Sequence, residues 1–270
     1  MARVNFRAAR DYVVYYGCGR VNEIASFDVA ILESSAHAAG EVADIIRRGC
    51  LPISYLSIIE SGEHLPYHSL ADAEDFLWVG GSRVMVPEFN TWVMDVRRPH
   101  WRDILLSAAD DMLRKGFVGL FLDTVGWAED PSLPRSLSFD LTESAQRLIK
   151  GLRTAHPEAV LIQNLGLRRL IQYTAPLLDG VCWEGFGDLP GRDPGDLRRV
   201  IDGLSMLRRL NDRHGLRVLL LAHSDLPVEI ASVLERDRSG CFMLYKGLAY
   251  SRTIEQNRGI QRENRLSCPR

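Results

Sequence analysis

Long apolar runs are missing from this sequence. No stretch approaches the roughly 18 consecutive apolar residues that a membrane-spanning helix needs. The first 17 residues, "MARVNFRAARDYVVYYG", place no apolar segment before a small-residue cleavage site, as a signal peptide would. We therefore expect no membrane partner. We expect either a cytoplasmic protein or a secreted one whose leader has been removed.

A strong charge of one sign is missing too. The 270 residues carry a formal net charge of -2, with 25% charged and 46% hydrophobic residues. These values are typical of a globular protein. Proteins that bind nucleic acid through their surface potential usually carry a large basic excess, so we expect no nucleic-acid partner.

Metal-binding and disulfide motifs are also lacking. The cysteines are odd in number, widely scattered and never spaced CxxC, which argues against a disulfide framework and a thiolate zinc site. No HExxH occurs, and Pro66 between His64 and His68 argues against a helix that would place both on one face. We expect no metal and no other cofactor.

What the sequence does contain is an alternation of strands and helices. Eight apolar runs of strand length are separated by segments of helical periodicity, and continuous rather than alternating runs are typical of strands buried on both faces. The runs begin at Tyr12, Phe27, Pro52, Phe117, Ala159, Asp179, Arg217 and Cys241. We predict an α/β fold, a single-domain (β/α)8 TIM barrel over residues 1–270. A doubly wound sheet is the alternative, but "YYGCGRVNE" lacks the third glycine of the dinucleotide fingerprint.

Local signals refine the helices and one connection. Asp140 and Glu143 have capping-box spacing at the start of a helix that Pro157 ends, and Asp225 is a plausible N-cap of a later helix. Residues 61–98 interrupt the alternation of strand-like and helical segments, and we expect them to form a long βα loop over one face of the barrel.

Polar residues follow most of the predicted strands. The catalytic groups of a (β/α)8 barrel stand at the C-terminal ends of its strands, so these residues should share one face. Glutamate is a poor helix N-cap, which disfavours a capping role for Glu33 and Glu184. The strand-end candidates are Glu33, Glu60, Asp123, Asn164, Glu184, His223 and Tyr245.

Carboxylates that converge in this way suit glycoside hydrolysis. One acts as acid and base at the glycosidic oxygen while the other attacks the anomeric carbon or activates water. Aromatic residues near strand ends, Tyr16 among them, could stack against sugar rings. Two alternatives stay open: a barrel that binds carbohydrate without cutting it, and a metal-dependent barrel hydrolase that uses His223 with the carboxylates.

Several segments resemble one enzyme family in order and spacing, over roughly residues 12–250. They are "YYG", "SFDVAILES", "ISYLSIIESGE", "WVMDVRRPHWRD", "GFVGLFLDTV", "LIQNLG" and "LLDGVCWEGF". The sequence is similar to the endo-α-1,4-polygalactosaminidase glycoside hydrolases, a group that also holds the hydrolase domain of Pel-polysaccharide processing proteins.

The resemblance implies endo-cleavage of α-1,4-linked galactosamine or N-acetylgalactosamine polymers, and the acidic strand ends suit a cationic, partly deacetylated polymer. It implies that Asp123 is the nucleophile and Glu184 the general acid/base, the arrangement of a retaining enzyme. It also matches Glu60, Asp95 and Asn164 to polar positions of the family's cleft. The chain departs from the family at Gly126 and at Ala222-His223, where relatives often carry a second acid and an Asp-Tyr pair.

Overall fold

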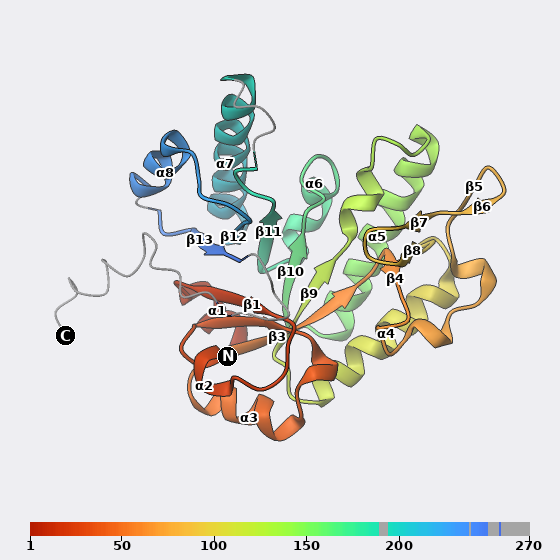
Figure 1. The fold of residues 1–270 in the computed structure, drawn as a ribbon, viewed down its shortest axis with the longest axis horizontal. Helices are drawn as coiled ribbons and strands as arrows, with labels where there is room; N and C mark the ends of the chain where they lie inside the picture. The colour runs from red at the N-terminus through yellow and green to blue at the C-terminus, as the bar shows by residue number, and fades with distance from the viewer. Residues whose placement is uncertain (189–193, 238, 248–253, 255–270) are drawn as a thin grey trace. The chain divides into compact units, whose positions relative to one another are not determined.

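The computed structural model describes residues 1–188, 194–237, 239–247 and 254 (Figure 1). Eight strands form the main sheet in the order β1-β2-β3-β9-β10-β11-β12-β13. Each apolar run read from the sequence overlaps one of them, which confirms the predicted α/β class and (β/α)8 barrel fold. Their bounds are β1 (Tyr12–Tyr15), β2 (Val29–Leu32), β3 (Leu51–Ser57), β9 (Gly119–Asp123), β10 (Val160–Asn164), β11 (Gly180–Glu184), β12 (Arg217–Ala222) and β13 (Phe242–Lys246).

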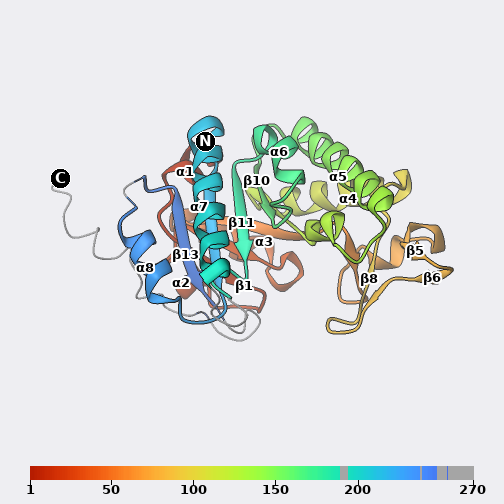
Figure 2. The ribbon, with the colours of Figure 1, turned by 90° about the horizontal axis from the view of Figure 1, so that it is seen from above.

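The chain divides into two compact units, and the first comprises Met1–Pro52 and Asp179–Arg270. In this unit β1 pairs in parallel with β2, and β11, β12 and β13 pair in parallel in that order. The two groups meet where β1 contacts β13. Helix α7 lies alongside β12 and contacts α8 (Figures 1 and 2). The unit's helices are α1 (Ala2–Ala8), α2 (Val21–Ile24), α3 (Ala39–Arg47), α7 (Pro194–His214) and α8 (Val228–Glu235), with the 3-10 helix η1 (Ser34–Ala36).

The second unit, Ile53–Leu178, contains the parallel strands β3, β9 and β10. Helices α4 and α5 pack beside each other, as both ribbon views show (Figures 1 and 2). Gly119 lies where β9 approaches its neighbours most closely: a Cβ there would stand 2.3 Å from the carbonyl oxygen of Val160. The unit's helices are α4 (Pro99–Arg114), α5 (Arg135–Ala155) and α6 (Leu170–Thr174), with the 3-10 helices η4 (Val125–Glu129) and η5 (Ala175–Leu177).

A long segment between β3 and α4 belongs to the second unit and includes residues 61–98, where a long βα loop was expected. It folds into a three-stranded antiparallel sheet of order β4-β8-β7 and a separate β5–β6 hairpin (Figure 1). We call it the β3–α4 excursion. Its elements are β4 (Glu60–Ser61), η2 (His68–Leu70), η3 (Ala73–Asp75), β5 (Trp78–Val79), β6 (Ser82–Arg83), β7 (Met85–Val86) and β8 (Thr91–Val93).

Two helix starts differ from the sequence-based expectation. Helix α5 begins at Arg135 after Pro134, so Asp140 lies inside the helix and the predicted capping box is wrong. Helix α8 begins after Pro227, and Asp225 forms an ion pair with Lys246 instead of capping it. In both cases a proline precedes the first helical residue. Since proline is tolerated at a helix start but not inside, it decides the boundary.

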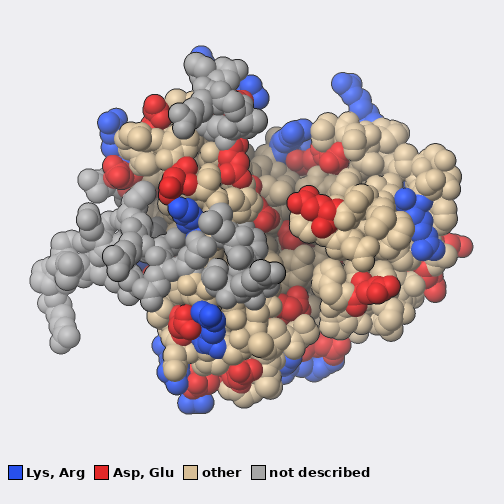
Figure 3. All heavy atoms as spheres, in the orientation of Figure 1, with Lys and Arg blue, Asp and Glu red and all other residues tan. Residues whose placement is uncertain are grey.

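The described surface mixes charges of both signs, and the face in Figure 3 shows Asp and Glu side chains among Lys and Arg side chains. Within the described residues, no helix is long and apolar enough to cross a bilayer. The extent of the single domain, residues 1–270, stays a prediction.

Candidate active site

Asp123 is the last residue of β9, and Asn164 is the last residue of β10. Parallel pairing of these strands places the two side chains together, and the Asn164 Nδ2 donates a 2.7 Å hydrogen bond to the Asp123 Oδ1. Asn164 is 1% exposed, whereas the Asp123 side chain is half-buried. A buried amide thus fixes one oxygen of a carboxylate that is still partly open to solvent.

Thr124, the next residue, has a left-handed backbone with φ of 63°. This conformation is unfavourable for a β-branched residue, so surrounding contacts must stabilise it. Its Oγ1 accepts hydrogen bonds from the backbone N–H groups of Ile59 and Glu60, at 2.9 and 3.1 Å. The Ile58 N–H also donates to the Asp123 carbonyl at 3.1 Å. These bonds tie the end of β9 to the residues that follow β3.

Glu60 begins β4, directly beyond β3, and both of its carboxylate oxygens are engaged. The Trp127 Nε1 donates to Oε1, and the Thr91 Oγ1 donates to Oε2 at 2.7 Å. Asp95 is also held on both oxygens, because Arg97 donates to them at 2.7 and 2.8 Å. Asp95 therefore forms a bidentate ion pair, the strongest arrangement of these two groups.

In the first unit, Glu184 ends β11 and His223 directly follows β12. The His223 imidazole lies between two carboxylates. Its Nε2 is 3.7 Å from the Glu184 Oε1, and its Nδ1 is 3.1 Å from the Asp188 Oδ2. The Ser224 Oγ contacts the other oxygen of Asp188 at 3.3 Å. The side chains of Glu184, Asp188 and His223 are all partly exposed, so solvent reaches this group.

The remaining residues named from the sequence lie in the first unit. Glu33 caps the 3-10 helix η1, since its Oε1 accepts from the Ser35 N–H at 3.2 Å. Disfavouring a capping role for Glu33 was therefore wrong: in a single tight turn the longer side chain still reaches the second N–H. Tyr16 is half-buried. Tyr245 is fully buried, with its ring 5.7 Å from that of Tyr12. Substrate contact by Glu33, Tyr16 and Tyr245 stays a prediction.

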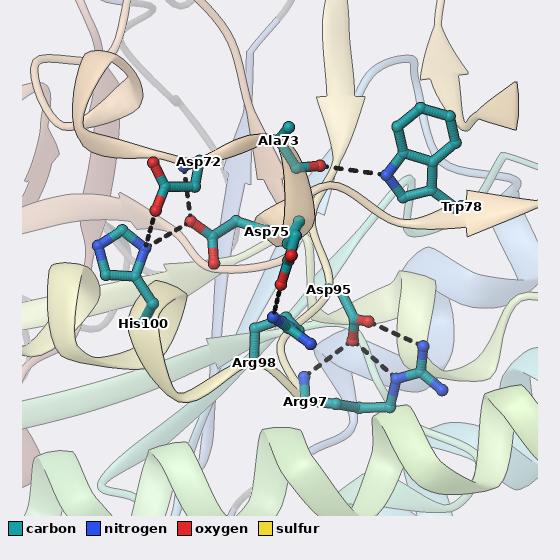
Figure 4. Close-up of polar contacts among 9 residues, drawn as sticks. Asp72, Ala73, Asp75, Trp78, Asp95, Arg97, Arg98 and His100 are labelled. Carbon is teal, nitrogen blue, oxygen red and sulfur yellow. Dashed lines mark hydrogen bonds and ion pairs between the residues drawn. The ribbon is translucent and has the colours of Figure 1, made fainter.

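One further group could offer metal ligands within the described residues. Ligand atoms of Asp72, Asp75 and His100 lie within 4.8 Å of one another (Figure 4). The His100 Nδ1 already lies 2.7 Å from Asp75 and 3.7 Å from Asp72, which is the pattern of an imidazolium held by carboxylates. The hydrogen bond to Asp75 raises the pKa of His100, which favours this ion-paired form.

Sequence reasoning missed Thr124. No residue type in "LDTVGW" marks a left-handed conformation, because glycine is the usual signal and the glycine here is two positions later. The bond between Asp188 and His223 depends on a turn with positive φ at Gly185 and Gly187, which no spacing predicts.

Comparison with known proteins identifies the family. The profile of glycoside-hydrolase family GH114 matches residues 5–189. The uncharacterized protein MJ1477 of Methanocaldococcus jannaschii is 28% identical over 127 residues, which are 44% of this chain and 33% of that protein. This match thus spans about a third of the relative's length.

Solved structures share the fold, two of them over about nine tenths of this chain. The glycoside hydrolase domain of PelA from Pseudomonas aeruginosa is 21% identical with a TM-score of 0.70, over 90% of this chain and 97% of that chain. Ega3 of Aspergillus fumigatus, in complex with galactosamine, is 11% identical with a TM-score of 0.67, over 91% and 93%. The family resemblance and the expected class of glycoside hydrolase are therefore confirmed: this chain belongs to glycoside-hydrolase family GH114.

Proposed function

We propose that this chain is an endo-acting glycosidase that cleaves α-1,4-linked polymers of galactosamine or N-acetylgalactosamine. The observation that carries the proposal is the pair of carboxylates, Asp123 and Glu184, that end β9 and β11 in a chain of this family. The reacting groups of a (β/α)8 barrel come from the C-terminal ends of its strands. Similarity in fold to Ega3, solved with galactosamine, supports the choice of sugar.

In the proposed mechanism Asp123 attacks the anomeric carbon while Glu184 protonates the leaving oxygen. Glu184 then removes a proton from the water that hydrolyses the glycosyl-enzyme, so that the anomeric configuration is retained. The bond from Asn164 leaves the second oxygen of Asp123 for the attack and orients it. Glu60, Asp95 and His223 contribute to substrate binding in this proposal.

The test is hydrolysis of a panel of polysaccharides by the wild type, Asp123→Asn and Glu184→Gln. The panel contains polymers of galactosamine, N-acetylgalactosamine and glucosamine and a neutral α-glucan. Asp225→Asn is the matched control, because Asp225 also follows a strand but forms an exposed pair with Lys246. We expect the two variants, but not the control, to lose at least about a hundredfold in kcat/KM.

Two further measurements on the wild type separate the alternatives. Binding of a polymer that is not hydrolysed would favour a non-catalytic carbohydrate-binding barrel. Metal analysis of the purified protein that finds stoichiometric zinc or manganese would favour a metal-dependent hydrolase. Proton NMR of the first product gives the stereochemistry. An α-anomer agrees with retention, whereas a β-anomer would assign Asp123 the role of a general base.

A further inference from the structure

The β3–α4 excursion carries a groove of about 380 Å³, a volume in the range of ligand pockets. We call it the Trp78 groove. None of the residues that line it is a strand-end residue of the main sheet, so it is distinct from the proposed catalytic groups. Its principal lining residues are Glu74, Phe76, Trp78, Asp95, Arg97 and Arg98, and Figure 4 shows the polar contacts around it.

An indole forms one wall of the groove. The Trp78 Nε1 donates to the Ala73 carbonyl at 3.1 Å, which fixes the ring, yet the residue is 49% exposed. The guanidinium of Arg83 lies 4.1 Å from the Phe76 ring centroid and 5.3 Å from that of Trp78, so it holds both rings in place. A fixed aromatic surface loses little conformational entropy when a ligand covers it.

The charged side chains of the groove are paired with one another. Arg97 binds Asp95 through two hydrogen bonds, and Arg98 forms an ion pair with Glu74. The hydrogen bond to Asp95 raises the pKa of Arg97, so its guanidinium stays charged. Two carboxylates and two guanidinium groups leave the lining without net charge. They still offer oriented donors, and their oxygens retain capacity to accept from a ligand.

We propose that the Trp78 groove is an outer subsite for a neutral, galacto-configured pyranose, such as an N-acetylgalactosamine unit of the polymer. The axial O4 of this sugar leaves one ring face covered by C–H groups, which suits stacking on an indole. Hydroxyl and acetamido groups match the fixed donors and acceptors. An ammonium group would gain no net attraction, because the two carboxylates of the lining are already paired with arginines and Arg83 adds a cation against Phe76 and Trp78.

The groove lies along the chain from the strand-end residues of the same unit. Val93 of β8 pairs in register with Glu60, and Asp95 of the groove is two residues further on. A polymer that contacts Glu60 therefore needs only to continue past β8 to reach the groove. This inference deepens the proposed function, because it assigns the acetylated unit of a mixed polymer to a separate position.

The experiment measures binding in the Asp123→Asn background, which prevents cleavage during the titration. Calorimetry gives Kd for the hexamer and the dimer of N-acetylgalactosamine with and without Trp78→Ala. Phe89→Ala is the control, because Phe89 is 62% exposed on the same excursion but does not line the groove. We expect Trp78→Ala to weaken hexamer binding about fivefold and dimer binding much less. The control should change neither.

Equal hexamer affinity with and without Trp78 would overturn the subsite. If Trp78→Ala weakens binding of the galactosamine hexamer as strongly, the preference of the subsite for a neutral unit is overturned. If it weakens binding of the N-acetylglucosamine hexamer as strongly, the preference for a galacto-configured unit is overturned. Hydrolysis by the wild type reports separately on the proposed function. If binding depends on Trp78 but the wild type does not hydrolyse the polymer, the subsite stands and the proposed enzymatic activity is wrong. If the wild type hydrolyses the polymer but binding does not depend on Trp78, only the subsite is wrong.

Discussion

Removal of the Asn164 amide tests whether Asp123 is positioned for chemistry. Asn164→Ala deletes the donor of the 2.7 Å bond to the Asp123 Oδ1 and leaves the carboxylate in place. A hydrogen bond to a charged group contributes about 1.5–3 kcal/mol. If that bond orients the carboxylate in the transition state, its loss lowers kcat/KM by about 12- to 160-fold, at 1.36 kcal/mol per factor of ten.

The neighbouring residue of β10 supplies a matched control. Gln163 is as buried as Asn164, but its side chain bonds to the Thr174 hydroxyl and the Leu165 carbonyl. Gln163→Ala also removes a buried amide, so it should reduce stability without the loss of activity. The assay compares kcat/KM on a galactosamine polymer with the free energy of unfolding in urea for both variants.

The comparison has a clear negative result. If Asn164→Ala keeps kcat/KM within about twofold of the wild type while both variants lose similar stability, the amide holds the fold only. The reasoning that orientation of Asp123 controls the reaction would then be refuted.

Three further outcomes are expected. Gly119→Ala should destabilise the chain by about 1–3 kcal/mol or more in urea unfolding, because its methyl group meets the Val160 carbonyl, and an unchanged midpoint would contradict the close approach. The bond to Asp75 raises the pKa of His100, so its stabilisation is complete below the unfolded value of about 6.5 and is lost as pH rises through the higher folded pKa. The gap in unfolding free energy between wild type and His100→Gln should therefore close at high pH, and a gap that widens there would refute the assignment. His223→Phe should lower kcat/KM by at least about tenfold with little change in Tm, since it removes the hydrogen bond of Nδ1 to Asp188 and the Nε2 that faces Glu184.

The main sheet could be predicted from the sequence because buried parallel strands leave an unambiguous mark. The run before Asp123 is buried on both faces, and the same holds for the strand that ends at Asn164. Helix starts were harder to predict. The spacing of Asp140 and Glu143 is correct for a capping box, but Pro134 already begins the helix upstream.

The candidate site could be predicted only in part, for a different physical reason. Strand ends identify which side chains leave the sheet, and this was enough to place Asp123 and Glu184 among the candidates. The contacts that hold these side chains join residues far apart in the sequence, such as the hydrogen bond from Asn164 to Asp123. Asp225 is a second example, because it forms an ion pair with Lys246, 21 residues away, instead of the predicted helix cap. No periodicity encodes such contacts.

The left-handed Thr124 has a consequence for loop engineering. Its hydroxyl accepts hydrogen bonds from Ile59 and Glu60, near the start of the β3–α4 excursion, so the excursion is anchored by a residue outside its own sequence. A graft of this excursion onto another barrel would need a threonine or serine, with the same backbone twist, after the adjacent strand. Without this hydroxyl, two backbone N–H groups of the grafted excursion would lack their acceptor, and the start of the excursion would have to change conformation on the new scaffold.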